Sequence, residues 1–182
     1  AYGNTLYFSA SDGTNGYELW RSDGTANGTM LVKDIYNGTG NGYFGGLTAV
    51  GNTLYFVAND GTNGSELWKS DGTANGTVMV KNINSAATGT SGTNPSSNPE
   101  YLTAVGNTLF FRANDGTNGT ELWKSDGTAN GTVMVKDIYN GNTTRMDFCC
   151  FSEANPGGSV VYITDPNDSN PSHLIAFDNA LY

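Results

Sequence analysis

Short apolar segments alternate with polar turns along most of this chain. In its middle part, four such segments are 47–50, 53–58, 66–70 and 78–83. The turns that join them lie at 51–52, 59–64 and 71–76. The two longer turns contain Asp-Gly and Asn-Gly pairs, which supply the positive φ angles that tight hairpins need. No stretch has the 3.6-residue apolar period of an amphipathic helix, so the pattern predicts four short strands per unit and an all-β fold.

The strand predicted at 53–58 is apolar on both of its faces. Leu54, Phe56 and Ala58 point to one side of the sheet, whereas Tyr55 and Val57 point to the other. A sheet with two apolar faces has to be covered on both of them. Each predicted sheet is therefore expected to lie between other layers of the same protein.

A long phrase that contains GNTLYF, DGTNG, ELW and SDGTANGT occurs three times with little change, at 3–35, 51–83 and 106–138. We divide the chain into unit 1 (1–50, without its first strand), unit 2 (51–105, with a loop insertion at 85–99), unit 3 (106–145) and a degenerate, incomplete unit 4 (146–182). In unit 4, the spacing aligns 160–164 with 109–113, and Leu174 with Leu122. The segment 176–182 also resembles 1–7.

The repeat length indicates the architecture. A four-stranded antiparallel sheet of this length, repeated and covered by its own copies, is typical of a propeller blade. The sequence therefore predicts a β-propeller-like tandem repeat of about three and a half units, with a β-solenoid as the alternative. Closed propellers usually have 4–8 blades, so the missing strands are expected to come from further repeats or from another copy of the chain. Strand addition between copies would give head-to-tail dimers or open filaments.

Three strings carry a family resemblance: Glu18 to Thr25, Glu66 to Thr73 and Glu121 to Thr128. They resemble the ELWxxDGT repeat of large bacterial cell-surface and secreted proteins. The resemblance covers roughly residues 1–140, and the last forty residues depart from it, with HLIAFD at 173–178 in place of ELWKSD. It implies a propeller-forming unit, a surface location and a structural or binding role, and it implies no catalytic residues.

Composition and charge exclude two classes of binding partner, nucleic acid and the membrane interior. The formal net charge is −9 and the isoelectric point is near 4.2, which argues against binding to nucleic acid. The longest apolar runs are only a few residues, so no insertion into a membrane is expected. No signal peptide is visible at Ala1, and we interpret the chain as a mature or partial secreted or cell-surface protein.

The acidic turns are candidate calcium sites. Asp12, Asp60 and Asp115 each begin a DGTNG turn, and each is followed at the same interval by a glutamate. Calcium takes six to eight oxygen ligands, often from Asp and Asn in a loop bent by glycine. The alternative is a hairpin turn that the Asp side chain stabilises by itself. We therefore predict no cofactor and no metal site, with calcium at these turns as the one candidate that the sequence offers.

Asparagine sequons are frequent. Eight residues begin an N-x-[ST] sequence and are glycosylation candidates: Asn27, Asn37, Asn63, Asn75, Asn118, Asn130, Asn142 and Asn167. Asn-Gly-Thr is also good turn chemistry, so the repeat multiplies these matches without implying sugar. Both interpretations stay open from the sequence.

The two cysteines are candidates for a disulfide, and the three tryptophans are candidates for the core or for a glycan-binding surface. Cys149 and Cys150 are adjacent and lack the spacing of a metal site. They are interpreted as partly buried thiols, a vicinal disulfide or bridges to other segments. Trp20, Trp68 and Trp123 recur once per unit and are expected in the core between units rather than on a glycan platform.

The sequence predicts no enzyme. Each turn carboxylate is copied from unit to unit, whereas a catalytic pair needs a unique constellation. The single histidine, His173, has no accompanying nucleophile motif. The leading hypothesis is an extracellular structural protein of a surface layer, biofilm matrix or self-assembled fibre. The alternative is an adhesion module that binds glycan or protein through its loops, and a glycosidase is a distant third.

Overall fold

The structure is a computed structural model that describes residues 3–85, 95–138, 145–147, 161–163, 169–171, 174, 176–177 and 180–181. Every regular element among them is a β-strand, and there is no helix in this part of the chain. The strands form three larger antiparallel sheets and two short strand pairs. The predicted all-β class is therefore confirmed.

The first sheet has three strands and the next two have four. The first contains β1 (Leu6–Ala10), β2 (Glu18–Ser22) and β3 (Met30–Lys33). The second contains β4 (Tyr43–Val50), β5 (Thr53–Asn59), β6 (Ser65–Ser70) and β7 (Val78–Lys81). The third contains β8 (Glu100–Val105), β9 (Thr108–Asn114), β10 (Thr120–Ser125) and β11 (Val133–Lys136). Within each sheet, consecutive strands are neighbours.

The two short pairs lie beyond the third sheet in sequence. One joins β12 (Arg145–Asp147) to β13 (Val161–Ile163), and the other joins β14 (Ala176–Phe177) to β15 (Ala180–Leu181). The four-stranded sheets begin at β4 and β8, so each takes its first strand from residues that the sequence analysis assigned to the preceding unit.

The turns form as the sequence predicts, because short polar side chains close them. In the SDGTANGT turn of the second sheet, Asp71 Oδ1 accepts hydrogen bonds from the backbone and hydroxyl of Thr73, at 2.9 and 2.7 Å. The Ser70 and Thr77 hydroxyls lie 2.7 Å apart across the base of the turn. These bonds satisfy backbone groups locally, so the hairpin needs no outside partner. The first and third sheets repeat them.

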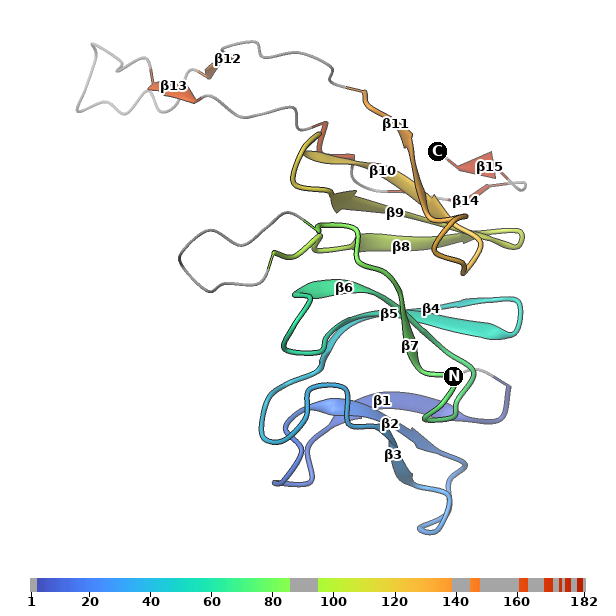
Figure 1. Cartoon of the computed structure of the whole chain (residues 1–182). Coiled ribbons are helices and arrows are strands. Elements are labelled where there is room, and N and C mark those ends of the chain that lie inside the picture. Colours follow the sequence, from blue (N-terminus) through green and yellow to red (C-terminus); the bar gives the residue numbers. More distant parts are fainter. Residues whose placement is uncertain are drawn as a thin grey trace, which may run out of the picture.

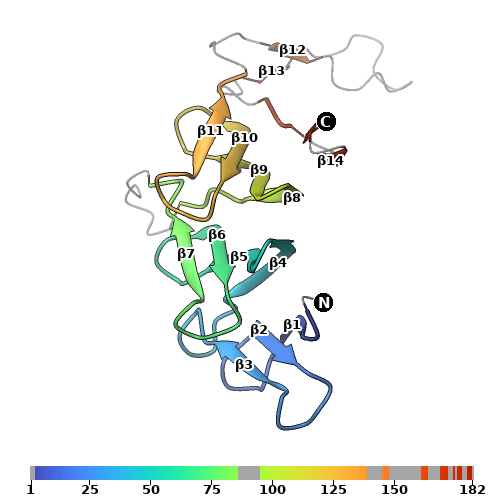
Figure 2. The same cartoon turned by 90° about the vertical axis from the view of Figure 1, so that its right-hand side faces the viewer.

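The three sheets lie one above another in a single column, as Figures 1 and 2 show from two sides. The described residues form an open stack and do not close into a ring. Antiparallel pairing within each sheet also differs from the parallel coils of a β-solenoid. The coarse prediction of stacked antiparallel sheets is thus confirmed, whereas a closed propeller is not seen.

The hydrophobic core lies between the sheets. One cluster joins Leu19, Val32 and Ile35 of the first unit to Phe56, Ala58 and Trp68 of the second sheet. An equivalent cluster joins the second sheet to the third: Val50, Tyr55, Leu67, Val80, Ile83, Leu109, Phe111, Ala113 and Trp123. The two-faced apolar strands are explained by this arrangement, since the second sheet contributes one face to each cluster. Trp68 and Trp123 lie in the core between units, as predicted, whereas the prediction is wrong for Trp20, which is half-buried because it lies on the outer side of the first sheet.

Candidate functional site

The most unusual side chains in the stack are three buried glutamates at one repeated position. Glu18, Glu66 and Glu121 stand at or beside the start of β2, β6 and β10, and each is fully buried. Ionised carboxylates are rarely buried unless charge or hydrogen bonds compensate the loss of water. The contacts of these glutamates therefore indicate what the position does.

Glu66 ties three separate segments together. Its Oε2 accepts from the backbone N–H of Ile83 at 3.0 Å, just beyond β7. Its Oε1 accepts from the N–H of Asn84 at 3.4 Å and from that of Ser97 at 3.0 Å. The Ser97 hydroxyl also donates to Oε2 at 2.5 Å. The carboxylate thus joins the strand β6, the exit from the second sheet and the entry to the third.

The other two glutamates connect the same three kinds of segment, and we call this connection the joint between units. Glu18 accepts from the N–H groups of Ile35, Tyr36 and Gly42 at 3.1, 3.2 and 2.9 Å. Glu121 accepts from the N–H groups of Ile138 and Ser169, at 3.1 and 3.2 Å, and from the Ser169 hydroxyl at 2.5 Å. Donors surround these oxygens, so the geometry suits a structural connector between units and does not suit a metal ligand or a general base.

Burial raises the pKa of Glu66 and of Glu18, and the hydrogen bonds from the backbone oppose that shift in part. The turn aspartates behave in the opposite way. Hydrogen bonds from the Thr73 hydroxyl and backbone lower the pKa of Asp71, and the same bonds to Thr25 and Thr128 lower those of Asp23 and Asp126. The two kinds of carboxylate therefore couple folding to pH with opposite signs.

The free energy of unfolding is expected to decrease as the pH rises from 4.5, the ordinary value for Glu66, through its raised pKa. Between those two values the folded state holds protons that the unfolded chain has lost, so folding weakens with pH. Below 3.8 the turn aspartates reverse the trend, because their lowered pKa values make the unfolded chain bind protons first. Urea unfolding across this range checks the profile, and E66Q should flatten its upper part. A steady rise in stability from pH 4.5 to neutrality would contradict it.

In each calcium candidate, the aspartate accepts hydrogen bonds within its own turn. Asp60 accepts from the N–H groups of Thr62 and Asn63, both at 2.8 Å, and from the Asn63 side-chain amide at 2.7 Å. Asp12 and Asp115 are bonded in the same way within their own turns. Glu66, which the sequence offered as a further ligand, bonds to other backbone groups instead. In the part of the chain that the structure describes, no group of three or more His, Cys, Asp or Glu side chains could hold a metal.

The structure separates the glycosylation candidates into three groups. Four are exposed on turns and loops: Asn27, Asn37, Asn75 and Asn130. Asn63 and Asn118 are half-buried, and the side-chain nitrogen that would carry a sugar donates to Asp60 or Asp115 at 2.7 Å. Asn142 and Asn167 lie outside the described residues, as do Cys149, Cys150 and His173.

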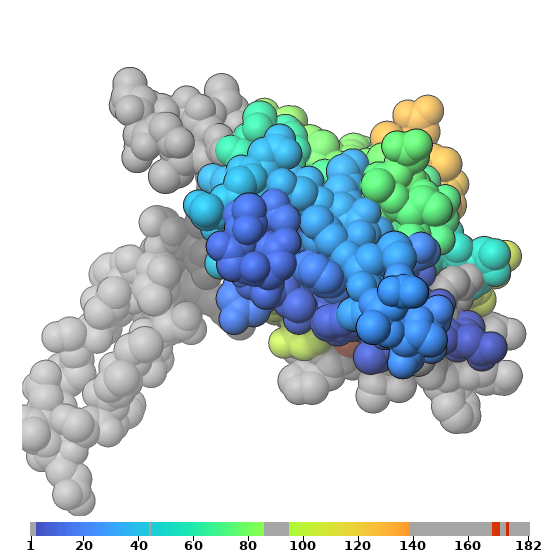
Figure 3. Space-filling view, turned by 90° about the horizontal axis from the view of Figure 1, so that it is seen from below, coloured from blue at the N-terminus to red at the C-terminus, as the bar shows by residue number. Residues whose placement is uncertain are grey.

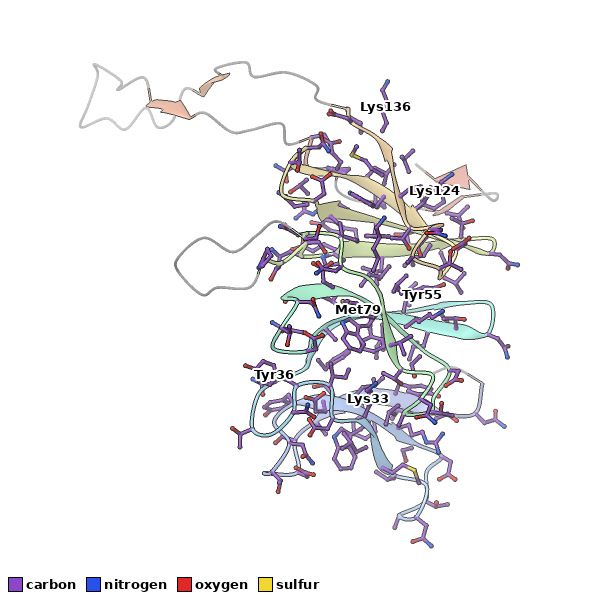
Figure 4. The ribbon with its side chains drawn as sticks, in the orientation of Figure 1. Lys33, Tyr36, Tyr55, Met79, Lys124 and Lys136 are labelled. Atoms are coloured by element: carbon purple, nitrogen blue, oxygen red, sulfur yellow. The ribbon has the colours of Figure 1, made fainter. Side chains whose placement is uncertain are left out.

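Basic side chains of one sheet donate hydrogen bonds to backbone carbonyls of the next sheet, and we call each such contact a clamp. Lys33 of the first sheet donates to the Thr77 carbonyl at 2.7 Å, with its ammonium 6.0 Å from the centre of the Trp68 ring. One unit later, Lys81 donates to the Thr132 carbonyl at 2.8 Å, with its ammonium 5.9 Å from the Trp123 ring. Figure 4 shows Lys33 between the first two sheets.

A second clamp lies beside the first one. Arg21 donates to the Gly72 carbonyl at 2.9 Å, and Lys69 donates to the Gly127 carbonyl at 2.8 Å. Each cation thus bonds to the SDGTANGT turn of the following sheet. The interface between the first and second sheets and the interface between the second and third therefore contain equivalent hydrogen bonds and equivalent hydrophobic clusters.

Substituting alanine at Gly72 is expected to destabilise the protein more than the same change at Gly24. Both glycines have a positive φ, 89° and 92°, so both variants bear a similar backbone cost of about 1 kcal/mol. A Cβ at Gly72 would lie 2.3 Å from the Tyr7 hydroxyl of the first sheet, whereas a Cβ at Gly24 meets nothing within 4 Å. Displacing Tyr7 should add about 1 kcal/mol, measurable by urea unfolding. Equal losses for the two variants would contradict the contact between the sheets.

At the two ends of the described stack, side chains equivalent to those buried between sheets are more exposed. In the third sheet, Val135 is 45% exposed, whereas its equivalent in the second sheet, Val80, is only 6% exposed. Ile138 is likewise exposed, and its equivalent Ile83 is buried. In the first sheet, Leu6 is 52% exposed, whereas Leu54 is 5% exposed. We define the trailing face as Leu122, Lys124, Val135, Lys136 and Ile138, and the leading face as Leu6, Phe8, Trp20, Gly24 and Thr29.

The clamps are open at the same two ends. Lys136 and Lys124 stand at the positions of Lys81 and Lys69, but both are exposed and donate to no group among the described residues. Figure 4 shows Lys136 projecting away from the stack. At the other end, Gly24 and Thr29 are exposed, whereas the equivalent Gly72 and Thr77 are buried. Figure 3, viewed from below, shows the first sheet in blue nearest to the viewer.

Sequence reasoning missed the partners of the glutamates. Ser97 falls in the stretch 85–99 that was interpreted as a loop insertion, yet it is fully buried against Glu66. Ser169 takes the equivalent place beside Glu121, so the register of the fourth unit is set from Ser169. Leu174 therefore corresponds to Leu102, and not to Leu122 as the spacing suggested. The signal available in the sequence was the match of 170–182 to 98–110.

Among the described residues, no helix is long and apolar enough to span a membrane. Comparison of this chain with protein-family models, with curated proteins and with solved structures finds no match in any of the three.

Proposed function

We propose that this chain is a non-enzymatic, extracellular structural protein whose stacked sheets associate end to end in a fibre, surface layer or matrix. The observation that carries the proposal is the pair of open faces. The trailing face and the leading face are the two halves of an interface that the chain builds twice within itself. A second copy placed on the trailing face would bury the same side chains in the same contacts.

The chemistry of the described residues supports a structural role. The buried carboxylates accept hydrogen bonds from backbone N–H groups of neighbouring segments. The turn aspartates accept hydrogen bonds from groups within their own turns. The stack offers two matching apolar faces that are exposed to water, and such faces are typical of interaction sites. The net charge of −9 suits a secreted protein that repulsion keeps soluble until its specific faces meet.

In this proposal each four-stranded sheet is a propeller-type blade, and the blades continue in an open column. Heterologous contacts between unlike faces form a ring if the rotation closes and a filament if it does not. The column in Figures 1 and 2 favours the filament. Recognition of glycan or protein through the exposed turns is the adhesion alternative, and it would be a property of the surface along such a column.

The test compares two valines on the same strand. Sedimentation velocity and electron microscopy of the wild type over a concentration series should show linear oligomers. Val135→Asp places a charge in the trailing face and should abolish them. Val133→Asp is the matched control, because Val133 is 37% exposed and so is its equivalent Val78 inside the stack. A wild-type chain that stays monomeric up to millimolar concentration, or equal effects of the two variants, would refute the proposal.

A further inference from the structure

In the part of the chain that the structure describes, β1 lies at one edge of the first sheet. Among the described residues β1 pairs only with β2, whereas β5 and β9 pair on both sides. Their additional neighbours are β4 and β8, the first strands of their sheets. An unpaired edge strand exposes a row of N–H and C=O groups that can accept another strand. The edge of β1 is therefore a place where a first strand would fit.

The carboxyl-terminal part of the chain contains a strand of this kind. In the pair β14–β15, Ala176 lies opposite Leu181 and Phe177 lies opposite Ala180. In the third sheet, Ala104 lies opposite Leu109 and Val105 lies opposite Thr108. The second sheet has the same register: Ala49 lies opposite Leu54, and Val50 lies opposite Thr53. By register, β14 is thus the first strand of a further sheet, and β15 is the beginning of its second strand.

This first strand is docked on the third sheet as β8 is docked on the second. Thr48 Oγ1 donates to the Leu102 carbonyl at 3.1 Å, and Thr103 Oγ1 donates to the Leu174 carbonyl at 3.4 Å. The N–H groups of Ser97 and Asn98 both donate to the Ser65 carbonyl. Those of Ser169 and Asn170 donate in the same way to the Thr120 carbonyl. The further sheet is therefore started in the correct place and continues the column.

The strands that would continue such a sheet have counterparts in the first sheet of the same chain. Among the described residues, the first sheet consists of β1, β2 and β3, which correspond to the second, third and fourth strands of the other two sheets. The residues overlap at the joint, because Ala180-Leu181-Tyr182 corresponds to Thr5-Leu6-Tyr7. β15 has two residues, whereas β1 has five and is hydrogen-bonded to β2 of a three-stranded sheet. Replacing β15 by β1 would pair β14 with a five-residue strand that is already part of a sheet, and it would also bury the leading face.

We infer that in the assembly β1 of a second copy displaces β15 and pairs with β14, so that β14 completes the first sheet of the second copy. This inference rests on the proposed end-to-end association and specifies how the joint is made. Strand addition to an edge supplies backbone hydrogen bonds, and the apolar face supplies register. In the resulting joint, Lys136 would donate to the Thr29 carbonyl of the second copy and Lys124 to its Gly24 carbonyl, as in the internal clamps.

Cysteine pairs test the predicted register directly. In a background with Cys149→Ser and Cys150→Ser, the double variant A176C and L6C should form a ladder of disulfide-linked oligomers on oxidation. Those positions face each other between copies by analogy with Ala104 and Leu109. The matched control, A104C with L109C, should form only an intramolecular bond. Each single variant should stop at a dimer.

A second variant separates strand exchange from simple stacking. If β15 is displaced, Leu181→Asp weakens only the pairing that must be lost, and association should increase. If β15 stays in place, position 181 corresponds in register to Leu109, which is buried in the third sheet, and the charge should decrease association. Oligomers that form without the A176C–L6C ladder, or that L181D disrupts, would overturn strand exchange and leave end-to-end association intact. A wild type without oligomers would overturn both.

Discussion

Replacing Trp68 with alanine is expected to lower the free energy of unfolding by about 3–5 kcal/mol. Trp68 is 6% exposed in the cluster between the first and second sheets, and the Lys33 ammonium lies over its ring. Removing the indole leaves a cavity that two rigid sheets cannot close. Because stacked repeats are coupled mainly through neighbouring interfaces, the loss should also separate the unfolding of the first sheet from that of the others. Urea unfolding followed by circular dichroism measures both effects.

Trp20 provides the matched control for this prediction. It occupies the same position in the first sheet, but it is only half-buried and belongs to the leading face. In dilute solution Trp20→Ala should cost about 1–2 kcal/mol, less than half the loss at Trp68. In concentrated solution it should weaken association, which Trp68→Ala affects only through the stability of the stack. Equal losses at the two positions in dilute solution would contradict the assignment of Trp68 to the interface between sheets.

Replacing Glu66 with alanine is expected to cost about 4 kcal/mol at neutral pH, the second large effect. The change leaves the buried N–H group of Ile83 without its acceptor, and it leaves the N–H group and the hydroxyl of Ser97 with the Ser65 carbonyl alone. Each unpaired buried donor costs about 1–3 kcal/mol, partly offset where water can enter. Thermal and urea unfolding measure the loss. If the alanine variant does not fold, Glu66→Gln should show about half of the effect, since one acceptor oxygen remains.

An exposed glutamate provides the control for Glu66. Glu100 forms an ion pair with Arg112, but its side chain is 52% exposed. Glu100→Ala should therefore cost less than about 1 kcal/mol. A small loss at Glu66, comparable to that at Glu100, would show that the carboxylate does not hold the two sheets together.

The strands and turns were predictable because the information for them is local. The alternation of Leu54, Tyr55, Phe56 and Val57 shows two apolar faces, and the observed β5 contains all of them within its buried run. The Asp-Gly and Asn-Gly turns close on their own side chains, so their shape depends on few distant residues. The same locality explains why Trp68 and Trp123 could be assigned to the core between units, whereas the half-buried position of Trp20 depends on its place at one end of the stack.

The joint at the glutamates could not be predicted, because its partners are distant in sequence. Glu66 is bonded to Ile83 and to Ser97 across two different connections, and the second of these is longer than its counterpart in the first unit. A glutamate at the start of a strand looks the same in sequence whether it faces solvent, a metal or backbone N–H groups. Only the path of the chain into the next sheet shows which of these it faces.

By itself, the sequence determined that this protein consists of repeated four-stranded antiparallel sheets with two apolar faces, because strand period and turn chemistry act over a few residues. Only the tertiary structure decided how the sheets follow one another, since a two-faced sheet can be stacked in a ring or in a column. That choice depends on long-range contacts such as Lys33 with Thr77 and Ser169 with Glu121. These contacts arrange the described sheets as a column, and the side chains exposed at its ends are equivalent to those buried between the sheets.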